Sequence, residues 1–211
     1  MTFLENIVSD INWRVSELAT LTTLPYRYRI ADAHVQTLLT YSVPAIYALW
    51  EGFVKNSFAM YVQQLNSLNL DINTIDENLL THAMTNGQDV DLGNSRTNFE
   101  SKKRYIKIIS AKYSNPLNII EEVPTQSNVN YAVINDILMR FNLEPLEQKY
   151  RASLQKLLTF RNSIAHGERT IPVKKKDIES FSNVLQDLML EVYSRIENGY
   201  NNSTYLKNRI E

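Results

Sequence analysis

Apolar residues recur at three- and four-residue steps along most of the chain, which is the spacing of an amphipathic α-helix. The first half predicts helices over residues 3–24 and 30–68, and Pro25 is expected to end the first of them. Pro44 lies inside the second segment and predicts a kink or break just before it, because proline removes a helical hydrogen bond. Apolar side chains cover more than one stripe of this second segment, so we expect it at the buried centre of a bundle.

The second half of the chain repeats the helical pattern. Apolar spacing predicts helices over residues 128–142, 145–166 and 173–198, with Gly167 and Gly199 expected at the ends of the last two. These segments together predict an all-α fold, a bundle of four to five core helices within a single domain over residues 1–200.

Two regions depart from this pattern. Between residues 70 and 127 the apolar spacing weakens, which predicts an insertion of mixed structure. Within it, residues 102–109 fit either a short strand or a helix, and periodicity does not choose between them. The polar residues 201–211 predict a C-terminal tail that is frayed or weakly helical.

The composition is that of an ordinary soluble globular protein, with 44% apolar and 21% charged residues. No run of eighteen apolar residues predicts a membrane span, and the N-terminus lacks the pattern of a secretory signal, so we expect a cytoplasmic protein. The chain has no cysteine, and its histidines (His34, His82 and His166) are far apart in sequence. We therefore expect no disulfide, no metal site and no cofactor.

The formal net charge is −1. A protein that coats nucleic acid without specificity is normally strongly basic, so this charge argues against such a function. It leaves room for a small site that binds a single phosphate.

The stretch Arg161-Asn162-Ser163-Ile164-Ala165-His166-Gly167 carries the most chemistry. It places a cation, a side-chain amide and an imidazole within about two helical turns. Asn162 and His166 are four residues apart and share a helix face, and the planar fork of Arg161 matches phosphate oxygens. A site that binds a phosphodiester and moves protons needs these groups. The structural alternative is that Arg161 pairs with a surface carboxylate and His166 caps the helix carbonyls.

This stretch resembles the Arg-x4-6-His signature of HEPN domains, all-α bundles found in many prokaryotic ribonucleases and toxins. Two more segments resemble the MAE_28990/MAE_18760-like HEPN nuclease family: Leu49-Trp50-Glu51-Gly52-Phe53-Val54-Lys55, and the helix from Asn130 to Leu143. The three matches stand in the family's order and span about residues 5–198.

The resemblance implies a metal-independent endoribonuclease in which the RNA 2′-hydroxyl attacks the adjacent phosphate. His166 would then be the acid/base, Arg161 the phosphate clamp, and Asn162 an orienter of His166 or of the RNA. One chain supplies one such histidine, so the resemblance also implies a homodimer with a composite site. A toxin or anti-phage effector, restrained by an antitoxin or another regulatory protein, is the implied role. The alternative is a non-catalytic HEPN bundle that binds a protein or a nucleotide.

Glu51 lies in a strongly apolar stretch, where a carboxylate needs a partner. It either orients Arg161 or His166 across the bundle, or occupies a solvated edge or a structural ion pair.

Four cations are weaker candidates for RNA binding. Lys102, Lys103 and Arg104 precede Tyr105 and can follow an RNA backbone, or they form a solvated face. Lys174 opens the last helix close to the motif and either adds phosphate affinity or lies in an exposed first turn.

Overall fold

The computed structural model describes residues 1–85, 99–113, 117–125, 128–168 and 172–207. These residues form seven α-helices: α1 (Phe3–Arg27), α2 (Asp32–Ser67), α3 (Glu77–Thr85), α4 (Phe99–Tyr113), α5 (Tyr131–Arg140), α6 (Lys149–Ala165) and α7 (Lys175–Asn201). Within the described part of the chain there is no β-sheet, so the predicted all-α fold is confirmed. None of these described helices is both long and apolar enough to cross a membrane.

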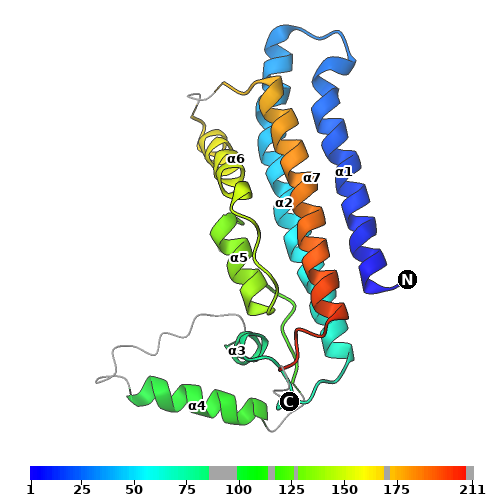
Figure 1. Cartoon of the computed structure of the whole chain (residues 1–211). Helices are drawn as coiled ribbons and strands as arrows, with labels where there is room; N and C mark the ends of the chain where they lie inside the picture. The colour runs from blue at the N-terminus through cyan, green and yellow to red at the C-terminus, as the bar shows by residue number, and fades with distance from the viewer. Residues whose placement is uncertain (86–98, 114–116, 126–127, 169–171, 208–211) are drawn as a thin grey trace.

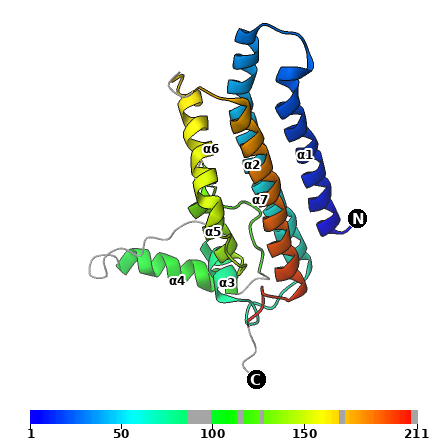
Figure 2. The ribbon, with the colours of Figure 1, turned by 45° about the horizontal axis from the view of Figure 1, so that its top comes forward.

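The long helices α1, α2 and α7 lie side by side, and α6 and α5 follow one another along the face of α2 (Figures 1 and 2). The central position predicted for residues 30–68 is confirmed, because α2 packs against α1, α6 and α7. Helix α2 supplies the four largest fully buried side chains, those of Trp50, Tyr61, Phe53 and Phe58. Burial of such side chains stabilises each by about 1.5–3 kcal/mol relative to exposure.

The helix boundary expected at Pro25 is wrong, and the break considered at Pro44 is not found. Pro25 lies inside the last turn of α1, and α2 continues without a break through Pro44. An interior proline costs a helix roughly 3 kcal/mol. Leu39, Val43 and Ile46 are all buried around Pro44, and their combined burial exceeds that cost at about 1.5–3 kcal/mol each.

Gly199 does not end α7 but lies within it. A Cβ atom at this position would lie 2.1 Å from Cδ2 of Leu143, so glycine lets α7 approach the turn that follows α5. The tail expected to fray is instead held by backbone hydrogen bonds from Asn202 to Lys207. The amide of Lys207 donates to the Thr74 carbonyl at 2.8 Å, and Leu206 forms an isolated antiparallel bridge with Ile75.

The region expected to be a mixed insertion contains two helices in its described part, whereas residues 70–76 and 117–125 form turns and irregular chain. It contains α3 and α4, and residues 102–109, left open between strand and helix, belong to α4. Residues 86–98 lie outside the described part. Figures 1 and 2 place α3 and α4 at one end of the bundle, whereas α6 ends at the other.

Candidate active site

The C-terminus of α6 closes with backbone hydrogen bonds. The amide of Gly167 donates to the Ile164 carbonyl at 3.0 Å, and that of Glu168 donates to the Ser163 carbonyl at 2.9 Å. Gly167 has φ +74°, the left-handed conformation that this helix ending requires and that glycine adopts without strain. The last carbonyls are therefore satisfied without the side chain of His166. That imidazole is exposed and makes no hydrogen bond to any described residue.

Arg161, one and a half turns earlier, is held by neutral groups. Its Nη1 donates to Oδ1 of Asn162 at 2.9 Å and to Oδ1 of Asn128 at 3.3 Å. The guanidinium carbon lies 4.9 Å from the centroid of the Tyr47 ring. Among the described residues, Nε and Nη2 have no hydrogen-bond partner, so part of the planar fork can still bind an anion.

In contrast to Arg161, whose described partners are neutral, some other arginines on the helices are paired with carboxylates. Arg14 pairs with Asp10 at 2.7 Å and Arg140 with Asp136 at 2.8 Å, each with the carboxylate one turn earlier. The residue one turn before Arg161 is the buried Leu157. Within the described chain Arg161 has no carboxylate partner, so the surface ion pair considered above is not found there. Its positive charge is held in place without being neutralised.

A clamp on the backbone of Val129 positions Asn128. The hydroxyl of Tyr47 accepts a hydrogen bond from the Val129 amide at 2.8 Å, and Nε1 of Trp50 donates to the Val129 carbonyl at 2.9 Å. Tyr47 and Trp50 are three residues apart and therefore share one face of α2. Both are buried, with 2% and 0% of their surface exposed. The buried face of α2 thus fixes the loop whose Asn128 holds Arg161.

Burial raises the pKa of Tyr47 to about 12. The Val129 amide and the charge of Arg161 oppose this rise, and the nearby Glu51 carboxylate adds to it. Tyr47 is therefore a neutral phenol at physiological pH, and its ring can attract the guanidinium of Arg161 through its π-face.

Glu51 itself forms an ion pair with Lys55, with 2.6 Å between Oε1 and Nζ. It lies close enough to Tyr47 to influence the hydroxyl. Among the described residues it forms no hydrogen bond or ion pair with Arg161 or His166. Its connection to the motif runs through Tyr47.

Gly52 completes this part of α2. A Cβ atom on Gly52 would lie 2.9 Å from Nη1 of Arg14, which donates to the Leu49 carbonyl at 2.8 Å. The three consecutive residues therefore differ in their contacts. Trp50 holds Val129, Glu51 lies beside Tyr47, and Gly52 leaves space for a buried arginine.

A family model of MAE_28990-like HEPN domains matches residues 3–205 of the chain. The chain belongs to this HEPN family. HEPN domains are generally ribonucleases or nucleotide-binding modules. No curated protein and no solved structure matched the chain.

The HEPN bundle brings some of the predicted site residues together and separates others. Arg161 and Asn162 are in contact, whereas the bond between Asn162 and His166 joins their backbones, amide to carbonyl, at 3.0 Å. Lys174 is exposed at the N-cap of α7. It belongs to the same end of the bundle as the C-terminus of α6 (Figures 1 and 2).

The exposed Lys102, Lys103 and Arg104 lie on α4, at the end of the bundle away from His166 (Figure 1). Within one chain they do not reach the motif.

Two residues around Arg161 have no distinguishing mark in the sequence. Tyr47 belongs to the apolar pattern of the central HEPN helix and reads as an ordinary core residue. Asn128 stands just before the helix-capping Asn130, whose side chain accepts from the Val133 amide at 2.9 Å. Only the folded structure brings them to the guanidinium.

Proposed function

We propose that this HEPN protein is a metal-independent endoribonuclease whose site contains Arg161 and His166. The observation that supports this most is the neutral cradle of Arg161, defined here as Asn162, Asn128 and the Tyr47 ring. A buried or half-buried arginine is normally paired with a carboxylate. An arginine that is held by two amide oxygens and an aromatic ring has neutral partners, so its charge can still bind an external anion. The phosphates of RNA are such anions.

The proposed reaction is an internal transesterification. The 2′-oxygen of the RNA bonds to the adjacent phosphorus while the bond from phosphorus to the 5′-oxygen breaks, which leaves a cyclic phosphate and a 5′-hydroxyl. A base takes the proton of the 2′-hydroxyl, and an acid gives a proton to the leaving oxygen. Arg161 stabilises the charge that accumulates on the phosphate. Asn162 positions Arg161 directly, and Glu51 helps to position Arg161 through Tyr47.

This chemistry uses two proton-transfer groups, and the motif of one chain holds the single histidine His166. We propose that a two-fold homodimer brings two motifs together, so that one His166 serves as base and its symmetry mate as acid. The exposed position of His166 at the end of α6 supports this arrangement. Light scattering tests it, and a monomer at the concentration at which RNA is cleaved would exclude it.

The decisive experiment compares the purified protein with His166→Ala and Arg161→Ala on total RNA in the presence of EDTA. The wild type is expected to cleave, and both variants are expected to lose activity by at least about a hundredfold, the lower range for loss of an acid/base. His34→Ala is the matched control, because His34 is an exposed histidine outside the motif. Intact RNA with the wild type, or equal cleavage by His166→Ala, would support the non-catalytic binding module instead.

The proposed biological role is that of a toxin or anti-phage effector in the cytoplasm, restrained by a protein partner. Expression of the wild type should then arrest bacterial growth. Expression of His166→Ala to the same level should not, which separates RNA cleavage from a general burden of overproduction.

A further inference from the structure

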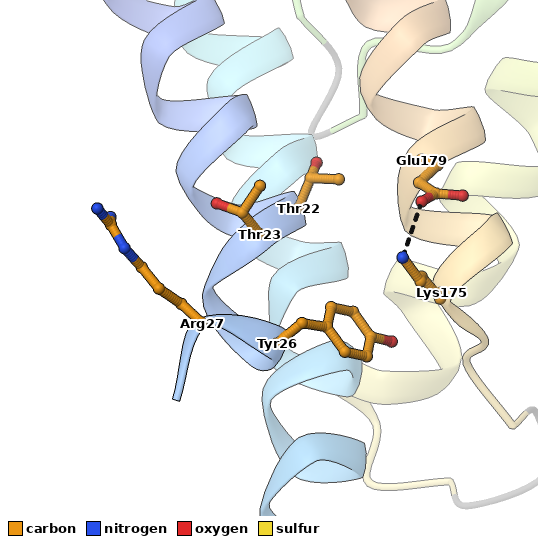
Figure 3. A pocket seen from close by; sticks show the side chains of 6 residues that line it. All are labelled: Thr22, Thr23, Tyr26, Arg27, Lys175 and Glu179. Atoms are coloured by element: carbon orange, nitrogen blue, oxygen red, sulfur yellow. Dashed lines mark ion pairs between the residues drawn. The ribbon is translucent and has the colours of Figure 1, made fainter. Parts of the chain in front are cut away.

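A groove of about 560 Å³ opens at the end of the bundle where α1 stops and α7 begins. It is lined by Thr22, Thr23, Tyr26, Arg27, Lys175 and Glu179 (Figure 3). Pockets for small ligands typically measure about 300–1,000 Å³, so this groove has room for a nucleotide.

The groove presents one aromatic ring and two cations. The Tyr26 ring projects toward α7, and Nζ of Lys175 lies 4.7 Å from its centroid (Figure 3). Lys175 also faces Glu179, with 3.6 Å between Nζ and Oε1. Arg27 extends outward from the rim and has no carboxylate partner among the described residues. These are the components of a site that stacks a base and holds the adjoining phosphate.

The hydroxyl groups of the groove have a defined polarity. Thr22 and Thr23 each donate to a carbonyl of α1, that of Leu18 and that of Ala19, both at 2.8 Å. Since each hydroxyl has one proton, both offer acceptor lone pairs toward the groove. Together with the carboxylate of Glu179 they match the donors of a nucleotide, namely the 2′-hydroxyl and the exocyclic amino groups.

The sequence after Arg27 continues the alternation of tyrosine and arginine that begins at Tyr26. Tyr28 and Arg29 follow Tyr26 and Arg27 and are exposed, Tyr28 with 65% of its surface. Exposed aromatic side chains interleaved with cations are typical of surfaces that bind single strands.

This end of the bundle is locally basic although the chain is not. Among the described residues, its exposed cations include Arg27, Arg29, Lys174, Lys175 and Lys176. The acidic groups nearby are Asp32, Glu168, Glu179 and Asp177, and Asp177 is already paired with Lys156 at 2.7 Å. The C-terminus of α6, and with it His166, belongs to this same end (Figures 1 and 2).

We propose that this groove binds a nucleotide of single-stranded RNA next to the bond that is cut. A base stacks on Tyr26, Arg27 and Lys175 contact the backbone phosphates, and Thr22, Thr23 and Glu179 accept hydrogen bonds from the ribose or the base. The choice of RNA as ligand rests on the proposed function. The site is distinct from the Arg161 cradle and would direct the strand toward His166.

The test measures the binding of a fluorescent single-stranded RNA to the His166→Ala protein by anisotropy over a series of salt concentrations. Tyr26→Ala should weaken binding about thirtyfold, the midrange for loss of one stacked base, and Tyr26→Phe should restore it. Arg27→Gln with Lys175→Gln should also weaken binding. It should lower the slope of log affinity against log salt by about 1.4, since each phosphate contact on a single strand contributes about 0.7.

Lys149→Gln with Arg151→Gln is the matched control. It removes two exposed cations at the start of α6, roughly 25 Å along that helix from His166. If the groove variants and the control variant have equal affinity and equal salt slope, the proposal that the groove binds RNA is wrong. It is also wrong if the His166→Ala protein does not bind RNA. Cleavage by the wild type is measured in parallel. Cleavage without groove-dependent binding refutes only this inference, whereas groove-dependent binding without cleavage refutes only the nuclease.

Discussion

The guanidinium of Arg161 lies over the ring of Tyr47, and the hydroxyl of the same tyrosine holds the Val129 amide. One buried side chain of α2 therefore touches the proposed phosphate clamp and also anchors the loop that supports it. The ring and the hydroxyl can be removed separately.

Tyr47→Phe should keep the ring under Arg161 but leave the Val129 amide without its acceptor. We expect it to lose about 1–3 kcal/mol of unfolding free energy in urea, the cost of a buried unsatisfied donor, while residual RNA cleavage persists. Tyr47→Leu should lose the cation–π contact as well and reduce kcat more than Tyr47→Phe does. Equal kcat for the two variants would show that the ring contributes nothing to Arg161.

Asn128→Asp tests whether the uncompensated charge of Arg161 matters. It is nearly isosteric and retains an acceptor for Nη1, but it gives Arg161 the carboxylate partner that it lacks. We expect a loss of RNA cleavage of about tenfold or more, because a neutralised guanidinium binds phosphate less strongly. Kinetic measurements should show an increase in KM together with a fall in kcat.

Asn128→Ala is the companion variant, since it removes the acceptor without adding charge. It should reduce cleavage less than Asn128→Asp does. The reverse order would mean that positioning by Asn128, rather than the charge of the cradle, limits the site.

Gly52→Ala should destabilise the protein although alanine is normally the better helix former by about 1 kcal/mol. The new methyl group would displace the guanidinium of Arg14, whose side chain is 6% exposed and hydrogen-bonded to the Leu49 carbonyl. Loss of a hydrogen bond from a charged group costs about 1.5–3 kcal/mol, so the net effect is a loss of about 1 kcal/mol. Urea unfolding measures it.

Gly167→Ala is a useful comparison, because no atom of the described residues lies within 4 Å of its added Cβ and the cost considered there comes from φ +74°. Gly167→Asn should recover part of that loss, since asparagine tolerates this conformation. Gly52→Asn should recover none. A neutral or stabilising Gly52→Ala would mean that Arg14 moves aside without losing its bond.

Asp177 should make the stability of the start of α7 depend on pH. Burial alone would raise its pKa, but hydrogen bonds from Lys156 and from the Lys174 amide outweigh burial and hold the pKa below its usual value. The stabilisation is present above the usual pKa of an aspartate, about 4, and is lost as the pH falls through the lower folded value. Asp177→Asn should cost about 0.5–2 kcal/mol at neutral pH, the range for a helix cap.

This difference between wild type and Asp177→Asn should shrink as unfolding is measured at decreasing pH below about 4. A difference that stays constant with pH would assign the effect to packing rather than to charge.

The sequence predicted the features that depend on near neighbours along the chain. Helical spacing located the core helices, and Arg161 with His166 could be recognised because only four residues at the end of one helix lie between them. The boundary rules failed at Pro25 and Gly199, and α2 continues through Pro44, because tertiary packing, which the local sequence does not contain, outweighs local preference at each position.

The cradle of Arg161 could not be predicted for a related reason. Asn128 and Tyr47 come from other segments, and each residue type also suits an unremarkable loop or core position. The basic residues of α4 show the opposite case. Lys102, Lys103 and Arg104 have the composition of an RNA-binding segment, yet the bundle places them at the far end from His166 (Figure 1).

The clamp on Val129 also has a consequence for the order of folding. Its two hydrogen bonds join residues that are 82 and 79 positions apart in the sequence. The hydrogen bond from Arg161 to Asn128 joins residues that are 33 positions apart. Contacts of such high sequence separation form late, because the entropy of closing long loops must be overcome first. On a ribosome, α2 would emerge long before its partners, and Arg161 would gain its supports only after most of the chain had been synthesised. A nuclease built in this way would be inactive as a nascent chain and would become competent only as folding finishes.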